Sequence, residues 1–252
     1  MRRLAAMAAV LAMALPVRAQ AQEAVPRGPD APEAPVLVEL FTSQGCAACP
    51  PADALLHRLA GREGVLPLAL HVDYWDYIGW KDRFADPAHT KRQKGYAQIA
   101  GRRMIYTPQM IVMGTDDVMG ADAVQVAEAI ARHSSAPRAV SVGLTRAGGS
   151  LNIHLAPRGS AAEGFAQGIA GADRLVVHLV RYAPLKTVRI TRGELAGRTL
   201  SYANVVEGWQ AVAEWDGRAP LDLTVPLPGP NRAAVVVQQG AHGPVLAAAR
   251  AD

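Results

Sequence analysis

The sequence predicts an α/β domain with a mixed sheet, followed by an all-β, sandwich-like domain. In the first half of the chain, apolar strand patterns alternate with helical ones. Beyond Pro137 the pattern changes to short alternating strands separated by Gly and Pro turns, which is typical of a sandwich or a partly closed barrel. We therefore expect the α/β domain over residues 35–135 and the β-sandwich-like domain over residues 138–252.

The elements of the α/β half follow from periodicity. The first strand is apolar on both faces apart from Glu39. Leu55, Leu56 and Leu59 recur at helical spacing before Gly61, and the pair at 86–87, Asp-Pro, is typical of a helix start. The expected strands lie at 36–41, 65–72, 110–113 and 118–119. Of the three expected helices, one ends at 61 and the other two span 86–101 and 123–133.

The elements of the β half follow from strict alternation of apolar residues. Val140, Val142 and Leu144 alternate with small or polar residues, and a Gly-Gly turn separates them from a second alternating run. The expected strands cover 140–144, 151–155, 175–182, 187–190, 211–215, 221–225, 233–239 and 245–248.

The N-terminal segment predicts export. Arg2 and Arg3 precede an apolar run from Leu4 to Val17, and small residues follow at 19–21 in the pattern that signal peptidases cut. The run is shorter than the roughly 20 apolar residues that cross a bilayer, and an uncleaved anchor is the alternative. We expect a signal peptide over 1–21, a flexible lead-in over 22–34, and a bacterial protein that is periplasmic or secreted.

The charge balance gives no sign of a nucleic-acid partner. The full chain carries a formal charge of +4, and loss of Arg2, Arg3 and Arg18 with the leader lowers it to +1. Nucleic-acid binding requires a clustered basic face. We expect no nucleic-acid partner and no membrane span after leader cleavage, and the oligomeric state is left open.

The cysteine count is the sharpest constraint, because Cys46 and Cys49 are the two cysteines of the chain. A structural staple over so short a loop removes little chain entropy, about 2 kcal/mol. Haem attachment needs His after the second cysteine, where Pro50 stands, and structural zinc needs four ligands. A redox dithiol needs only two thiols at this spacing. The pair therefore favours disulfide exchange, with the staple and the metal site as alternatives.

Two segments resemble the thioredoxin superfamily. The strand at 36–41 leads into the C-x-x-C pair and a helix, and Tyr106-Thr107-Pro108 stands before the strand at 110–113. The resemblance implies that Pro108 is cis and faces the two sulfurs; an ordinary strand-entry proline is the alternative. It also implies that Tyr106 and Thr107 contact the substrate, with the Thr107 backbone presented to an incoming substrate chain.

A closer resemblance covers nearly the whole mature chain. Residues 39–45, 74–82, 106–109 and 192–200 are similar to an exported bacterial family of unknown function, numbered 1223. That family has no settled substrate, so the resemblance implies a fold and a cellular location. In the segment 74–80, Trp75 and Trp80 are expected to form a wall of the substrate groove, and covering the core is the alternative.

The positions of the site residues predict their roles. Cys46 is expected to be exposed and to attack, and Cys49 to resolve the mixed disulfide. Pro50-Pro51 indicates that the helix begins at Pro50, so the effect of the helix dipole on Cys46 is left open. Glu39 resembles the buried carboxylate of thioredoxins, which implies proton transfer with Cys49; pairing with an Arg is the alternative.

The sequence thus predicts an exported thiol–disulfide oxidoreductase that acts on protein or small-thiol disulfides without a cofactor or metal. Cys46, Cys49, Pro108 and Glu39 are the expected catalytic residues. The alternative is a non-catalytic thioredoxin-fold binding protein, either a copper carrier or an assembly factor. Soft ligands for copper could come from the four methionines Met104, Met110, Met113 and Met119, although such side chains commonly fill cores.

Overall fold

The computed structural model describes residues 34–166 and 174–251. The predicted signal peptide and the lead-in up to residue 33 lie outside the described residues. In the described part of the chain, no helix has the length and apolar character needed to cross a membrane.

The first half alternates strands and helices, as its periodicity predicted. The strands β1 and β2 are parallel neighbours, and β3 pairs antiparallel with β1. The elements are β1 (Val36–Thr42), α1 (Pro50–Ala60), β2 (Val65–His71), the short 3-10 helix η1 (Asp76–Ile78), α2 (Pro87–Ile99), β3 (Gln109–Val112), β4 (Asp116–Met119) and α3 (Ala123–Ser135).

Local chemistry fixes where the helices begin. The Asp86 carboxylate accepts a hydrogen bond from the Ala88 N–H at 2.8 Å, and Pro87 occupies the first turn of α2. Asp122 caps α3 in the same way, through the N–H groups of Val124 and Gln125. The start of α1 differs, because Cys49 is the residue before the helix and contributes no side-chain cap.

The second half is built mainly of strands. Two predicted strands, 175–182 and 187–190, are one continuous strand, and the predicted strand at 211–215 is the end of a long one. A short helix at Gly159–Ala166, α4, was not predicted. The strands are β5 (Val140–Ala147), β6 (Ser150–Pro157), β7 (Leu175–Arg189), β8 (Thr199–Trp215), β9 (Leu221–Pro226), β10 (Arg232–Gln239) and β11 (Val245–Ala251).

The continuity of β7 has a clear physical basis. Pro184 lies inside the strand and has no N–H to give to a neighbour. The pairing of β10 with β7 ends at Tyr182. At Pro184, β8 pairs with one edge of β7, and no other described strand pairs with the opposite edge. A strand with an open edge tolerates proline there. The break in the apolar pattern therefore marks the end of a pairing and leaves the strand uninterrupted.

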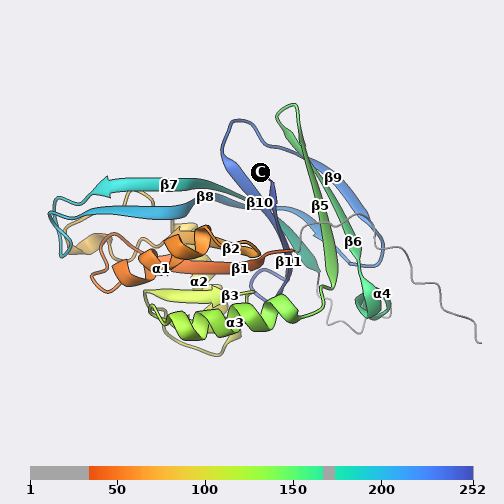
Figure 1. The fold of residues 1–252 in the computed structure, drawn as a ribbon, viewed down its shortest axis with the longest axis horizontal. Coiled ribbons are helices and arrows are strands. Elements are labelled where there is room, and N and C mark those ends of the chain that lie inside the picture. The colour runs from red at the N-terminus through yellow and green to blue at the C-terminus, as the bar shows by residue number, and fades with distance from the viewer. Residues whose placement is uncertain (1–33, 167–173, 252) are drawn as a thin grey trace, which may run out of the picture. The chain divides into compact units, whose positions relative to one another are not determined.

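One sheet runs through both halves of the chain. Its order is β11-β10-β7-β8-β2-β1-β3-β4, and β8 joins β2 where Ala69 lies opposite Val205. Figure 1 shows the long β7–β8 hairpin beside β2, next to the end of β1 from which α1 follows. The predicted boundary between residues 135 and 138 falls between α3 and β5. The division into two domains stays a prediction, and the main sheet crosses it.

Of the three apolar cores in the described chain, two share the strand β10. Along β10, Ala234 and Val236 belong to the core with β1, β2 and α1, whereas Val235 and Val237 belong to a second core. The second core also contains Leu151 and other residues of the separate three-stranded sheet β5-β6-β9. Alternation along a strand therefore makes β10 a wall of both cores.

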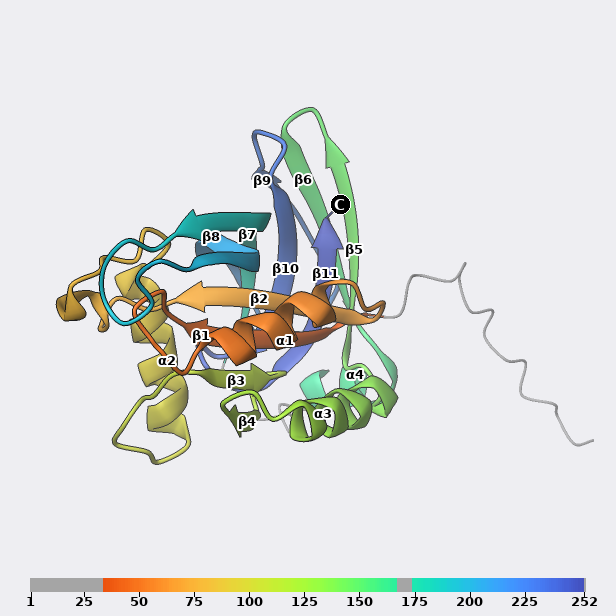
Figure 2. The same ribbon diagram turned by 60° about the vertical axis from the view of Figure 1, so that its left-hand side comes forward.

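The same alternation on β1 decides which helix each side chain meets. Glu39 reaches Arg92 of α2, and Thr42 reaches Asp53 of α1. Positions 39 and 42 are an odd number of residues apart, so their side chains leave opposite faces of the strand. Figures 1 and 2 show α1 and α3 on one side of the central strands and α2 on the other.

Candidate functional site

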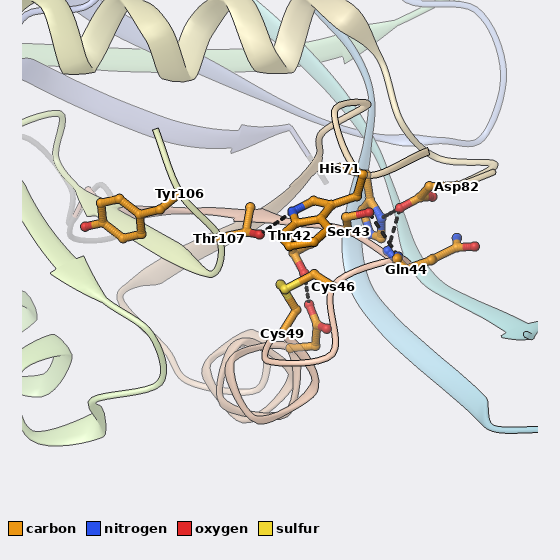
Figure 3. The surroundings of a disulfide bond; sticks show 12 residues. Thr42, Ser43, Gln44, Cys46, Cys49, His71, Asp82, Tyr106 and Thr107 are labelled. Carbon is orange, nitrogen blue, oxygen red and sulfur yellow. Dashed lines mark hydrogen bonds and ion pairs between the residues drawn. A yellow bond between two sulfur atoms is a disulfide. The ribbon is translucent and has the colours of Figure 1, made fainter. Parts of the chain in front are cut away.

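Cys46 and Cys49 form a disulfide in the connection between β1 and α1. Their Cα atoms are 5.4 Å apart, within the range of an ordinary disulfide. Figure 3 shows the bond at the start of α1, with Thr42 and Thr107 nearby. The C-x-x-C pair therefore stands at the end of a parallel strand and directly before a helix.

The prediction that Cys46 is exposed was wrong. Cys46 has 1% of its surface exposed and Cys49 none. The segment 73–80 packs over the loop that carries Cys46: a Cβ atom on Gly45 would lie 3.1 Å from the Trp75 Cβ. Glycine at position 45 permits this close approach, and the resulting cover shields the disulfide from solvent.

A hydrogen bond ties this cover to the segment before β3. The Trp75 indole Nε1–H donates to the Thr107 hydroxyl oxygen at 2.7 Å (Figure 3). The Thr107–Pro108 peptide bond is cis, as the resemblance to thioredoxins implied. The structure thus brings three predicted site residues from two distant loops, Trp75, Thr107 and Pro108, to the region of the disulfide between Cys46 and Cys49.

The first turn of α1 offers no free N–H to a sulfur. Pro50 and Pro51 have no N–H, and the N–H groups of Ala52 and Asp53 donate to the Cys49 carbonyl at 2.9 and 3.1 Å. The Cys49 N–H donates to the Cys46 carbonyl. Stabilisation of a thiolate by helix N–H groups is therefore weak here. Another group has to manage the thiol proton.

Asp53 is a buried carboxyl one helical turn after Cys49 that sequence reasoning missed. It lies four residues after Cys49, a spacing that places side chains on one helix face. Its Oδ1 accepts a hydrogen bond from the Thr42 hydroxyl at 2.8 Å, and its Oδ2 has no partner among the described residues. Burial raises the pKa of Asp53 to about 7, with the Thr42 bond and His71 opposing the rise.

A second buried polar group adjoins Asp53. The His71 ring donates from Nδ1 to the Asp82 carboxylate at 2.7 Å, which also accepts the Gln44 N–H at 2.8 Å. These residues appear together in Figure 3. The His71 Nε2 has no partner in the described chain. With Nδ1–H bonded to Asp82, Nε2 is the ring nitrogen left for a further hydrogen bond.

A cavity connects Asp53 with the molecular surface. It has a volume of about 310 Å³ and lies between α1 and the start of β8, with Asp53 and Tyr202 among its lining residues. The Tyr202 hydroxyl has no partner among the described residues, and burial raises its pKa well above the usual range. Tyr202 is thus protonated at neutral pH. Water in this cavity can exchange protons with Asp53.

Glu39 lies in a different environment. It is fully buried, and its two oxygens accept hydrogen bonds from Arg92 Nε at 2.5 Å and Arg92 Nη2 at 2.9 Å. The Tyr96 hydroxyl adds a third bond at 2.6 Å. This pairing was the alternative considered from the sequence. Because Glu39 faces α2 while Thr42 faces α1 and its residue Asp53, the proton-transfer role of Glu39 stays a prediction that the geometry does not favour.

Two predicted groove residues point elsewhere. The Tyr106 hydroxyl donates to Asp117 at 2.6 Å, and Figure 3 shows its ring directed away from the disulfide. The Trp80 Nε1–H donates to the Gln44 side-chain oxygen at 2.8 Å, so Trp80 fixes the far end of the covering segment. Of the aromatic residues proposed for a groove, Trp75 is the one beside the cysteines.

The methionines do not form a cluster. Met110 and Met113 are buried, whereas Met104 and Met119 are 77% and 70% exposed. Within residues 34–166 and 174–251, no group of three or more His, Cys, Asp or Glu side chains is arranged to hold a metal ion. The copper-carrier alternative stays an untested prediction.

Comparison with known proteins gives a family without an assigned activity. Residues 37–238 match the family model described as "Protein of unknown function (DUF1223)". No curated protein matches the chain. A crystal structure of a protein from Agrobacterium tumefaciens is similar, with 32% identity and a TM-score of 0.70, over 87% of this chain and 95% of that one. HBP35 of Porphyromonas gingivalis is similar in fold alone, with 12% identity and a TM-score of 0.57, over 87% and 75% of the two chains.

Proposed function

Because the chain belongs to the family described as "Protein of unknown function (DUF1223)", whose description assigns no activity, we propose a function from the site itself: an exported thiol–disulfide oxidoreductase. The observation that carries the proposal is the C-x-x-C disulfide beside a buried, half-paired carboxyl, that of Asp53. A purely structural staple has no use for a nearby group that exchanges protons near neutral pH. An exported location, where disulfides persist, is part of the proposal.

A thioredoxin-like fold for residues 35–135 is also part of the proposal. The order β1-α1-β2-α2-β3-β4-α3 supports it, as does the mixed pairing of β1 with β2 and β3. The disulfide at the start of α1 and the cis Thr107–Pro108 bond before β3 agree with the same fold. In this fold the β7–β8 hairpin extends the sheet beyond β2.

The proposed reaction proceeds through two exchanges. In the reduced protein, the Cys46 thiolate attacks a substrate disulfide, forms a mixed disulfide with one substrate sulfur and releases the other as a thiolate. Cys49 then attacks the Cys46 sulfur, the disulfide between Cys46 and Cys49 closes, and the second substrate thiolate leaves. Asp53 accepts the proton that Cys49 loses. Two electrons pass from the protein to the substrate, and the reverse sequence oxidises a substrate dithiol.

Access to Cys46 requires the covering segment to move. Trp75 packs against Gly45, the neighbour of Cys46, and its indole is held by the bond to Thr107. Opening breaks this hydrogen bond and frees the Thr107 hydroxyl. A substrate chain that binds beside Thr107 replaces the cover over the disulfide. The proposal therefore assigns Trp75 to gating and Thr107 to substrate contact.

Trapping of mixed disulfides tests the proposal. Cys49→Ser leaves Cys46 able to attack but unable to be released, so this variant is expected to accumulate covalent complexes with a disulfide-containing protein such as insulin. Cys46→Ser is expected to accumulate few. The parent protein is expected to reduce insulin disulfides with turnover, and both variants are expected to lose this activity. Equal trapping by both variants contradicts the roles assigned to Cys46 and Cys49. If the parent shows no turnover and the purified reduced protein carries one equivalent of bound metal, the carrier alternative is favoured.

A further inference from the structure

A second cavity lies on the α2 side of the sheet, away from the disulfide. It has a volume of about 410 Å³ and is lined by α2, β7, β8 and the loop between β10 and β11. Cavities of this size hold small metabolites. Its residues play no part in the proposed exchange reaction.

Buried polar atoms at this cavity have no protein partner. His178 is 6% exposed, and neither of its ring nitrogens forms a hydrogen bond with the described residues. The same is true of the Trp209 Nε1–H. An unsatisfied buried donor or acceptor costs about 1–3 kcal/mol, and native proteins rarely leave such groups unpaired. Two neighbouring residues with three such atoms indicate that something else binds them.

The lining of the cavity is cationic. Lys91 and Arg181 line it, and neither forms an ion pair with a described residue. The acidic residue in the lining, Asp86, is occupied in capping α2. Burial lowers the pKa of His178 to about 3, and the positive charges of Arg92 and His242 add to that effect.

The walls are held in place without a ligand. The Arg92 guanidinium lies 3.8 Å from the centre of the Trp209 ring and is fixed by Glu39. Gly208 lets the Arg181 guanidinium lie across the strand, since a Cβ there would be 3.3 Å from Arg181 Nη2. Donors fixed in advance lose little conformational freedom when a ligand binds.

We propose that this cavity binds a small organic anion, with its carboxylate or phosphate group held by Arg181, Lys91 and the N–H groups of His178 and Trp209. All these groups donate hydrogen bonds to oxygen, and charge-assisted bonds of this kind are about twice as strong as neutral ones. A water molecule satisfies one unpaired atom but leaves the positive charges unbalanced. The site is independent of the disulfide and of the proposed exchange reaction.

Titration of the full chain, followed by NMR of the Trp209 indole N–H, tests the proposal. Inorganic phosphate and succinate serve as separate probes, with sodium chloride at equal ionic strength as the control. A saturable shift of the Trp209 signal with phosphate assigns a phosphate site, and one with succinate assigns a carboxylate site. No shift beyond that of chloride with either probe overturns the proposal.

Matched variants separate a site from general electrostatic attraction. Arg181→Gln removes a cavity donor and is expected to weaken binding about tenfold or more. Arg189→Gln makes the same change on the same strand outside the cavity and is expected to leave the affinity unchanged. Lys91→Gln and Lys94→Gln form a second such pair on α2. Equal weakening by both members of each pair contradicts the site.

Discussion

Two buried carboxyls lie against opposite faces of β1, and their surroundings differ. Glu39 faces α2, where Arg92 and Tyr96 supply three hydrogen bonds to its oxygens. Asp53, on α1, receives one hydrogen bond from Thr42 and keeps one oxygen unpaired among the described residues. Both lie close to the same strand, and both are removed from bulk water.

The difference shows how partners decide what a buried acid can do. A carboxylate held by a guanidinium stays charged and ties two elements together. A carboxyl buried with a single neutral donor is poised to gain or lose a proton near neutral pH, as the pKa of about 7 at Asp53 indicates. Glu39 is therefore a structural anchor in this account, and Asp53 is the proton-transfer group.

The largest expected effect comes from breaking the Glu39–Arg92 pair. Arg92→Met leaves the buried Glu39 carboxyl without its main hydrogen-bonding partner, so the free energy of unfolding is expected to fall by about 3–5 kcal/mol. Lys94→Met, on the exposed side of the same helix, is the control and is expected to change it by less than about 0.5 kcal/mol. Denaturant unfolding of both variants measures this. Similar losses in the two contradict the structural role of the pair.

Asp53 is expected to make stability fall as the pH rises. Its folded-state pKa of about 7 lies above the ordinary value of 3.8, so between these values the folded state binds a proton that the unfolded state has released. The unfavourable contribution therefore grows from about pH 4 to about pH 7, to a size on the order of 4 kcal/mol. Above about pH 7 this contribution of Asp53 to the free energy of unfolding no longer changes with pH.

Unfolding of the oxidised protein between pH 4 and pH 8 measures this trend. Asp53→Asn cannot titrate and is expected to remove the decline, whereas Asp222→Asn, at an exposed carboxylate, is expected to keep it. His178, whose pKa burial lowers to about 3, makes an opposite contribution in this range that the parent and Asp53→Asn share. The difference in stability between these two proteins is therefore the test, and a difference that does not change with pH shows an Asp53 with an ordinary pKa.

The same substitution separates the two carboxyls in the reaction. Asp53→Asn is expected to slow disulfide exchange roughly 100-fold near neutral pH, because proton transfer by a positioned group contributes about that much or more. Glu39→Gln is expected to leave the rate–pH profile of the parent unchanged. Stopped-flow measurement of exchange over a pH series checks both. A slowed Glu39→Gln alongside an unaffected Asp53→Asn would reverse the assignment.

The smallest expected effect concerns the cover over Cys46. Trp75→Phe keeps the ring but removes the hydrogen bond to Thr107, which contributes about 1 kcal/mol. Opening is then about fivefold more frequent, and reduction of the disulfide by dithiothreitol is expected to accelerate by that factor. Trp80→Phe removes a bond to Gln44 at the other end of the segment and is expected to act less. Equal rates in the parent and Trp75→Phe show that the bond does not control access.

Sequence reasoning reached most elements of the first half and the cysteine pair but not the surroundings of that pair. Strand and helix periods are local, so β1, α1 and α2 were predictable within one or two residues. The burial of Cys46 depends on the packing of Trp75 against Gly45, and the partner of Glu39 lies on a helix far along the chain. Neither contact leaves a local pattern.

The prediction and the structure also differ at Asp53 and in β7, and there too contacts distant in sequence decide the outcome. Asp53 was missed because an acid in the first turn of a helix is ordinarily explained by the helix dipole. Its four-residue distance from Cys49 was the available signal. The strand β7 was divided in the prediction because Pro184 reads as a break, and its tolerance depends on where the pairing with β10 ends.

The redox equilibrium of the Cys46–Cys49 pair against glutathione tests the central claim most directly. The reduced fraction is measured over a series of glutathione ratios, with circular dichroism on the same samples to follow folding. The account predicts a reversible two-electron equilibrium in which the protein stays folded in both states. A disulfide that resists reduction until the protein unfolds contradicts the account and identifies the pair as a structural staple.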